Sequence, residues 1–177
     1  MRLPPLLLLA LLCACADDAP APDPSWLDAE DPEQRKEALY ALSPEERQEH
    51  LPRLLGMARG DPSPEVRQLA IGVAGTAASQ GGDNPAVPVF VELLHDWDQT
   101  GSQLAAATAL GNLRTREACE AMLDALIHWP QPPRDMIVNE LRDAVARTRR
   151  PCEASVRARL KQHPDEMREI LELMRRK

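Results

Sequence analysis

The sequence predicts an all-α fold in which helix pairs stack into an α-solenoid, and three observations support that prediction. First, the segment from Val66 lines up with the segment from Ser102 at an interval of 36 residues, so that Gly75 falls on Gly111. Second, both segments place small and apolar residues on one stripe at helical spacing, and such a face needs neighbouring helices to cover it. Third, the chain has 17 prolines, and many stand where a helix would begin. A unit of this length with two helices is typical of a solenoid.

The helices in front of these two segments repeat as well. Leu51 to Ala58 matches Val87 to Leu94 at the same interval. Weaker third and fourth copies begin at Cys119 and Cys152, within the related strings TREACEA and TRRPCEA. We therefore predict a half repeat followed by about four pairs, in a right-handed superhelical stack over residues 25–177. The predicted helices lie near 32–42, 44–58, 64–79, 85–95, 100–113, 116–128, 133–148, 151–162 and 165–175.

Capping residues and prolines place the helix boundaries. Ser63 and Asn84 each stand directly before a proline, where a side-chain oxygen caps the first turn and the missing amide is not needed. Ser43 begins a capping box, with a glutamate three residues later. Pro52 and Pro88 instead lie inside the first helix of two units, so we expect each to kink its helix.

The first strong unit is similar to a known repeat family. Its residues resemble the Asp…Val-Arg…Ala…Gly pattern of HEAT repeats, in the short bacterial, phycobilisome-lyase-like form, at Asp61, Val66, Arg67, Ala70 and Gly75. The resemblance covers about residues 31–177. Tetratricopeptide repeats have a similar period, but their expected Trp, Tyr and Phe positions are not filled here.

The resemblance has structural implications. The first helix of each unit would lie on the convex side of the stack and the second helix on the concave side. Asp61 and Arg67 would join a ladder of buried polar contacts between repeats. Gln103 stands where the next unit would repeat the arginine, so the ladder should be interrupted there.

The N-terminus has the pattern of an export signal. Leu6 to Leu12 is an apolar run that is too short to span a bilayer, and it follows a positive end. The string Leu-Cys-Ala-Cys that ends at Cys15 resembles a bacterial lipobox, which implies a signal peptide over 1–14 and a palmitate-bearing lipid anchor on Cys15. A plain secretory signal is the alternative. Residues 15–24 alternate proline with small or acidic residues, so they form an extended tether.

Charge is unevenly distributed over a chain whose net charge is −7. Residues 17–100 carry 17 acidic and 6 basic side chains, whereas residues 101–177 carry 11 acidic and 14 basic ones. These positions are either ordinary solvated helix faces or a basic surface that steers an acidic partner. The candidate basic surface comprises Arg142, Arg147, Arg149, Arg150, Arg157 and Arg159. Nucleic acid is not an expected partner, because the total charge is acidic and stacking aromatic residues are scarce.

Catalytic and metal motifs do not emerge from the sequence. His95, His128 and His163 recur at the end of successive first helices, about 8–10 Å apart, which is too far for one shared metal ion. We therefore predict no metal and no cofactor. The first hypothesis is a monomeric, non-enzymatic scaffold, anchored in the bacterial cell envelope on the periplasmic or surface side of the outer membrane, whose concave face binds a protein or peptide. The alternative is an enzyme or enzyme subunit, bilin-lyase-like or other, with an unrecognised groove site.

Two further cysteines, Cys119 and Cys152, leave two interpretations open. An exported protein meets an oxidising compartment, which allows a disulfide between them. Equivalent positions on stacked helices lie about 8–10 Å apart, however, whereas a disulfide needs Cα atoms at roughly 4.4–6.8 Å. The alternative is that both are small, buried, unpaired hydrophobic residues.

Overall fold

The structure is a computed structural model that describes residues 23–79, 84–96, 98–128 and 135–176. Within these ranges the chain is helical throughout and has no strand. A short 3₁₀ helix, η2 (Pro24–Asp28), comes first. The α-helices are α1 (Pro32–Ala41), α2 (Pro44–Glu49), α3 (Leu51–Gly60), α4 (Pro64–Ala78), α5 (Ala86–Leu94), α6 (Thr100–Leu113), α7 (Arg116–His128), α8 (Asp135–Arg147), α9 (Arg149–Arg159) and α10 (Pro164–Arg176).

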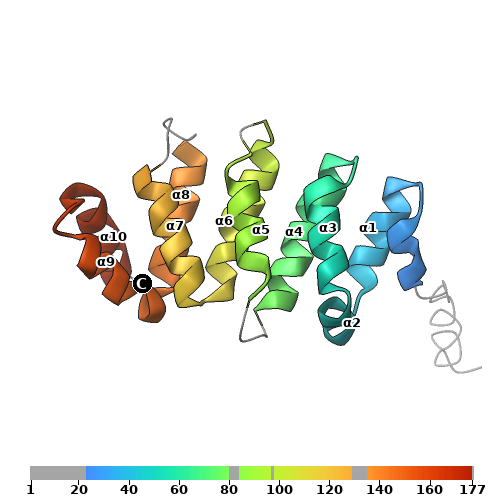
Figure 1. Ribbon diagram of the computed structural model, residues 1–177, viewed down its shortest axis with the longest axis horizontal. Helices are drawn as coiled ribbons and strands as arrows, with labels where there is room; N and C mark the ends of the chain where they lie inside the picture. The colour runs from blue at the N-terminus through green and yellow to red at the C-terminus, as the bar shows by residue number, and fades with distance from the viewer. Residues whose placement is uncertain (1–22, 80–83, 97, 129–134, 177) are drawn as a thin grey trace, which may run out of the picture.

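The helices follow one another along the long axis of the molecule in two layers (Figure 1). In the second-helix layer, α1 packs against α4, α4 against α6, α6 against α8 and α8 against α10. In the first-helix layer, α3 lies beside α5, α5 beside α7 and α7 beside α9. Each unit joins the layers, since α3 packs on α4, α5 on α6, α7 on α8 and α9 on α10. The fold is therefore the all-α solenoid that the sequence predicts, with α1 as the half repeat.

Glycines let the second-helix layer pack closely. A Cβ atom added to Gly75 of α4 would lie 3.0 Å from the Cβ of Ala109 in α6. One added to Gly111 of α6 would lie 2.7 Å from the Cβ of Ala144 in α8. In the first-helix layer, α5 and α7 are more widely spaced and leave a hollow between them. A stack curves toward its more closely packed layer, so we assign the second helices to the concave face.

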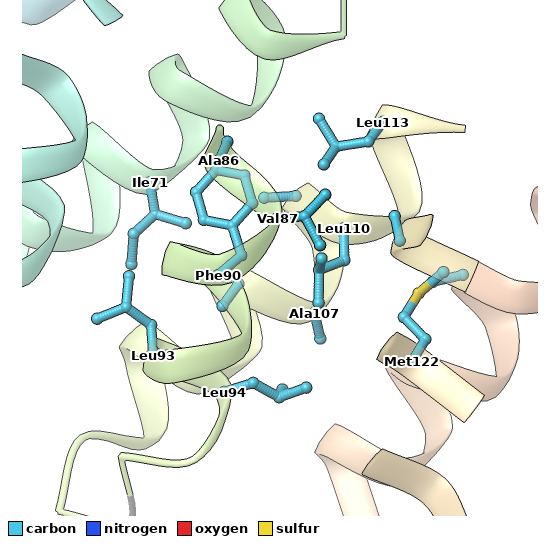
Figure 2. Close-up of a cluster of buried hydrophobic side chains, with 14 of the residues drawn as sticks. Ile71, Ala86, Val87, Phe90, Leu93, Leu94, Ala107, Leu110, Leu113 and Met122 are labelled. Carbon is cyan, nitrogen blue, oxygen red and sulfur yellow. The ribbon is translucent and has the colours of Figure 1, made fainter. Parts of the chain in front are cut away.

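The core is continuous between units. Figure 2 shows part of it, where Ile71 of α4, Phe90 of α5, Leu110 of α6 and Met122 of α7 meet in one cluster. Phe90 is the single phenylalanine of the chain and is fully buried. A side chain of this size stabilises the fold by about 1.5–3 kcal/mol when fully buried. The motif positions Val66 and Ala70 belong to the same core and are also fully buried.

The predicted helix at 44–58 is two helices, so the expectation of one kinked helix was wrong. α2 ends at Glu49, and His50 has φ −89° and ψ 7° before α3 begins at Leu51. Pro52 is the second residue of α3, where its missing amide leaves no hydrogen bond unmade. The expected kink at Pro88 was wrong for the same reason. Pro88 is the third residue of α5 and therefore lies in its first turn, not in the helix interior.

The caps agree with the sequence. The Ser63 hydroxyl accepts a hydrogen bond from the Val66 amide, and Ser43 forms a complete capping box with Glu46. The Asn84 side chain accepts from the Ala86 amide at 3.2 Å. At the C-terminal end the prediction is off by a few residues, since α9 begins at Arg149 and ends at Arg159.

Candidate interaction surfaces

The repeat motif holds a buried ion pair. The carboxylate of Asp61 accepts two hydrogen bonds from the guanidinium of Arg35, at 2.9 and 2.8 Å, and a third from the Ser63 amide at 2.9 Å. Arg35 also donates to two backbone carbonyls just before α1. Arg67 donates to the Asp61 backbone carbonyl, not to its carboxylate. Both charged groups of the pair are thus hydrogen-bonded, as buried charges must be.

Sequence reasoning missed Arg35, although a signal was present. Pro32 and Arg35 repeat Pro64 and Arg67 at an interval of 32 residues, so α1 supplies the arginine of the preceding repeat. The ladder ends after this one step. Gln103 donates to a backbone carbonyl of α5 at 3.1 Å, and the Nε atom of Arg67 is buried without a hydrogen-bond partner among the described residues.

Cys119 of α7 and Cys152 of α9 form a disulfide. Their Cα atoms are 5.5 Å apart, so the expected separation of about 8–10 Å was wrong for this pair. Each cysteine is the fourth residue of its helix, and both are fully buried. The first turns of α7 and α9 therefore converge more closely than two helix axes of average spacing.

A polar network lies beside the disulfide. Glu120 of α7 accepts hydrogen bonds from the Ser155 hydroxyl and the Arg159 guanidinium of α9. Arg159 also donates to Asp124 at 2.6 Å. Burial alone would raise the pKa of Glu120, but the hydrogen bonds from Ser155 and Arg159 outweigh it and hold that pKa below its ordinary value. Glu120 therefore remains ionised and cross-links the two helices.

The six arginines of the candidate basic surface do not form one surface. Arg142 pairs with Glu169, Arg157 pairs with Glu153, and Arg159 belongs to the network just described. These three are structural ion pairs. The sequence could not reveal this, because their acidic partners come mostly from other helices.

The other three, Arg147, Arg149 and Arg150, line one hollow of about 460 Å³ together with Arg114. We call this hollow the basic pocket; Thr148 and Pro151 complete its wall. Arg147 pairs with Glu140 at 2.8 Å. Sequence reasoning missed Arg114, which stands 33 residues before Arg147 and comes to the same pocket because α6 and α8 are stacked neighbours.

Beyond the first turn of α4, which carries Glu65 and Arg67, the exposed side of α4 and α6 is free of charge. From Gln68 to the end of α4 at Ala78 no residue is charged, and none is charged in α6. We call this the neutral face. Its exposed and half-buried residues are Gln68, Leu69, Gly72, Thr76, Thr100, Gly101, Leu104, Ala105, Thr108 and Asn112. In a chain with 28% charged residues, this absence of charge over two adjacent helices stands out.

The neutral face and the basic pocket adjoin. A second hollow of about 400 Å³ lies at the C-terminal ends of α4 and α6, and Thr76, Ser79 and Asn112 line it. Arg114 lines both this hollow and the basic pocket. The two features therefore form one continuous surface.

The first-helix layer has its own groove of about 480 Å³ between α5 and α7. Val87, Val91 and Ala121 contribute apolar lining, and His95 and His128 lie along the groove. The His128 ring makes an edge-to-face contact with His163, with ring centroids 6.0 Å apart. This pair is closer than the expected helix spacing of about 8–10 Å.

Other expectations lie outside what the structure describes. Cys15, the signal segment and most of the tether precede residue 23, where the description begins. Among the described residues there is no group of three or more His, Cys, Asp or Glu side chains placed to hold a metal ion. None of the described helices combines the length and the apolar character that crossing a membrane requires.

A family model described as HEAT repeats matches residues 51–142, which is more than half of the chain. The match spans α3 to α8, apart from the last residues of α8. No curated protein matches the chain.

Proposed function

The chain belongs to the HEAT-repeat family, and we propose that it is a lipid-anchored scaffold of the cell envelope that binds a protein partner along its concave second-helix layer. HEAT repeats in general are protein-interaction scaffolds. The role proposed for this chain is binding, without catalysis and without a cofactor.

The neutral face is the observation that carries the proposal. The cores of protein interfaces are depleted in charged residues, because desolvating a charge is costly. Gly72, Thr76 and Asn112 present small or uncharged groups to solvent on adjacent helices. Among the described residues, the two exposed large hydrophobic side chains, Tyr40 and Met136, also belong to helices of this layer.

The anchor is supported by the sequence alone. The Leu-Cys-Ala-Cys string places Cys15 after a short apolar run, and about ten tether residues then separate it from the helical part. Acyl chains on one cysteine give stable membrane attachment, since each buried CH₂ contributes about 0.8 kcal/mol. In a membrane-fractionation experiment, Cys15→Ser should leave the membrane fraction or remain unprocessed. If the variant stayed lipid-labelled and membrane-bound, the anchor assignment would fail.

Affinity capture from detergent-solubilised membranes of the source cells tests the scaffold. Gly72→Arg puts a charge on the neutral face, at a helical position where an added Cβ meets no atom within 4 Å. Gly56→Arg is the matched control, because Gly56 is equally exposed and unobstructed but lies on α3 in the first-helix layer. A partner captured by wild type should be lost with Gly72→Arg and kept with Gly56→Arg. The reverse pattern, or equal capture by all three, would refute the concave-face proposal.

A further inference from the structure

We infer that the basic pocket binds the carboxylates of an acidic, Asp/Glu-rich segment of the partner protein, whose remaining residues lie on the neutral face. The inference rests on the proposed function and deepens it by naming the chemistry of the partner.

Of the four arginines that line the pocket, only Arg147 forms an ion pair with a described carboxylate, that of Glu140. The side chains of Arg114, Arg149 and Arg150 are exposed and make no hydrogen bond with a described residue. Arg149 attracts the carboxylate of Glu153, but the hydrogen bonds to that carboxylate come from Arg157. Elsewhere in the described C-terminal half, the arginines of the predicted basic surface are held by acids. Three guanidinium groups that face one concavity present up to three planar forks, the geometry that binds carboxylates in bidentate fashion.

Helix electrostatics explain only part of this arrangement. Arg114 caps the C-terminus of α6 and Arg147 ends α8, where a positive charge is favourable. Arg149 and Arg150 occupy the first turn of α9, the positive end of that helix, where basic residues are unfavourable. The attraction between Arg149 and Glu153 offsets part of this cost, and an external anion in the pocket would offset more of it for both arginines.

An acidic peptide segment fits better than an extended anionic surface. The chain carries a net charge of −7, and its excess of acidic residues lies in 17–100, so an extended nucleic acid or anionic bilayer that also reached this half would be repelled there. A short segment needs only the pocket. The pocket is also a concavity of about 460 Å³ that a flat bilayer cannot enter but a protruding loop can. Continuity with the neutral face through Arg114 allows the same partner to occupy both.

The test is fluorescence anisotropy of the full-length protein in detergent with a fluorescein-labelled octaglutamate peptide. Wild type should bind it, and binding should weaken as salt rises from about 50 to 300 mM, because exposed charges are screened. Arg149→Ala/Arg150→Ala should weaken binding at least about tenfold, the usual scale for removing charge-assisted contacts. Arg175→Ala/Arg176→Ala is the matched control, since it removes the same charge from adjacent, exposed arginines at the end of α10.

Several results would overturn the inference. One is an equal loss in both double variants, which would mean that binding follows net charge only. Another is the absence of peptide binding. A third is that anionic phosphatidylglycerol vesicles or inorganic phosphate bind with the same dependence on Arg149 and Arg150 while the peptide does not. A failure of the proposed function would give a different result from a failure of this inference. If Gly72→Arg still captured the partner while peptide binding still required Arg149 and Arg150, only the assignment of the neutral face would be wrong.

Discussion

The spacing of the second-helix layer should depend on two glycines, and replacing one of them tests this directly. In Gly111→Ala the new Cβ would lie 2.7 Å from the Cβ and 3.3 Å from the Cα of Ala144. Neither atom can move away by a rotamer change, so α6 and α8 must separate. Gly72→Ala is the control, because Gly72 is also in a helix of this layer but its Cβ would meet nothing within 4 Å.

The two substitutions should change the free energy of unfolding in opposite directions. Alanine in place of glycine in a helix interior should stabilise the protein by about 0.8–1 kcal/mol, and Gly72→Ala should show that gain alone. Gly111→Ala has the same gain but also an overpacking cost of about 1–3 kcal/mol, which the fixed backbone contact places in the upper part of that range. We expect a net loss of about 1–2 kcal/mol. The two variants should then differ by about 2–3 kcal/mol, or roughly 4–12 °C in Tm for a chain of this size.

Urea unfolding followed by circular dichroism gives the comparison, with the slope of the transition checked because repeat stacks can unfold in parts. Gly75→Ala, whose Cβ would lie 3.0 Å from Ala109, should fall between the other two. If Gly111→Ala proved as stable as Gly72→Ala, close contact at Gly111 would not set the spacing of the layer. The reasoning that this layer is the concave one would then lose its basis.

Three further outcomes are expected. Asp61→Ala should lower the free energy of unfolding in urea by about 3–5 kcal/mol, because it leaves Arg35 buried and unpaired. Replacing both Asp61 and Arg35 with apolar residues should lower it by less, and an equal loss in the single and double variants would contradict the pairing. Replacing Cys119 and Cys152 with serine should cost about 4 kcal/mol by the chain-entropy estimate for a loop of 33 residues, and alkylation of both thiols in unreduced protein, detected by mass spectrometry, would exclude the bridge. The folded-state pKa of Glu120 is lowered, so its contribution is full above the ordinary glutamate value of 4.5 and is lost as pH falls below it. Glu120→Gln should thus be less stable than wild type at pH 7, and the difference should shrink as the pH is lowered through the folded-state pKa of Glu120; a difference that stayed constant with pH would refute the ionic role.

The architecture could be predicted because its signals are local and periodic. Propensity and capping act between residues that are close in sequence, as in the stripe from Val66 and the caps at Ser63 and Asn84. The 36-residue interval is periodic because it repeats these local signals. The break at His50 was missed because Pro52 was assigned to a helix interior, although a proline one residue after a helix start is equally regular.

Contacts between units were harder to predict. The pairing of Arg35 with Asp61 spans 26 residues and joins a half repeat to the first full one. The predicted basic surface is not continuous because Arg142 pairs with Glu169 and Arg159 pairs with Glu120. These pairings depend on how helices from different units face each other. Conversely, Arg114 came into the basic pocket only through stacking. Side-chain pairing across repeats depends on helix rotation, which the hydrophobic stripe fixes only coarsely.

The two ends of the solenoid are stabilised by different means, and the difference bears on function. A terminal unit has one neighbour and buries less apolar surface than an inner one. At the N-terminal end the Arg35–Asp61 pair joins α1 to the first full unit. At the C-terminal end a disulfide and the Glu120 network both join α7 to α9. Arg149 and Arg150 begin α9, three and two residues before Cys152, so the bridge that secures the last unit also holds the backbone from which these two arginines extend. The backbone of a pocket held in this way is ordered before an acidic segment binds, so the entropy cost of binding falls mainly on the exposed arginine side chains.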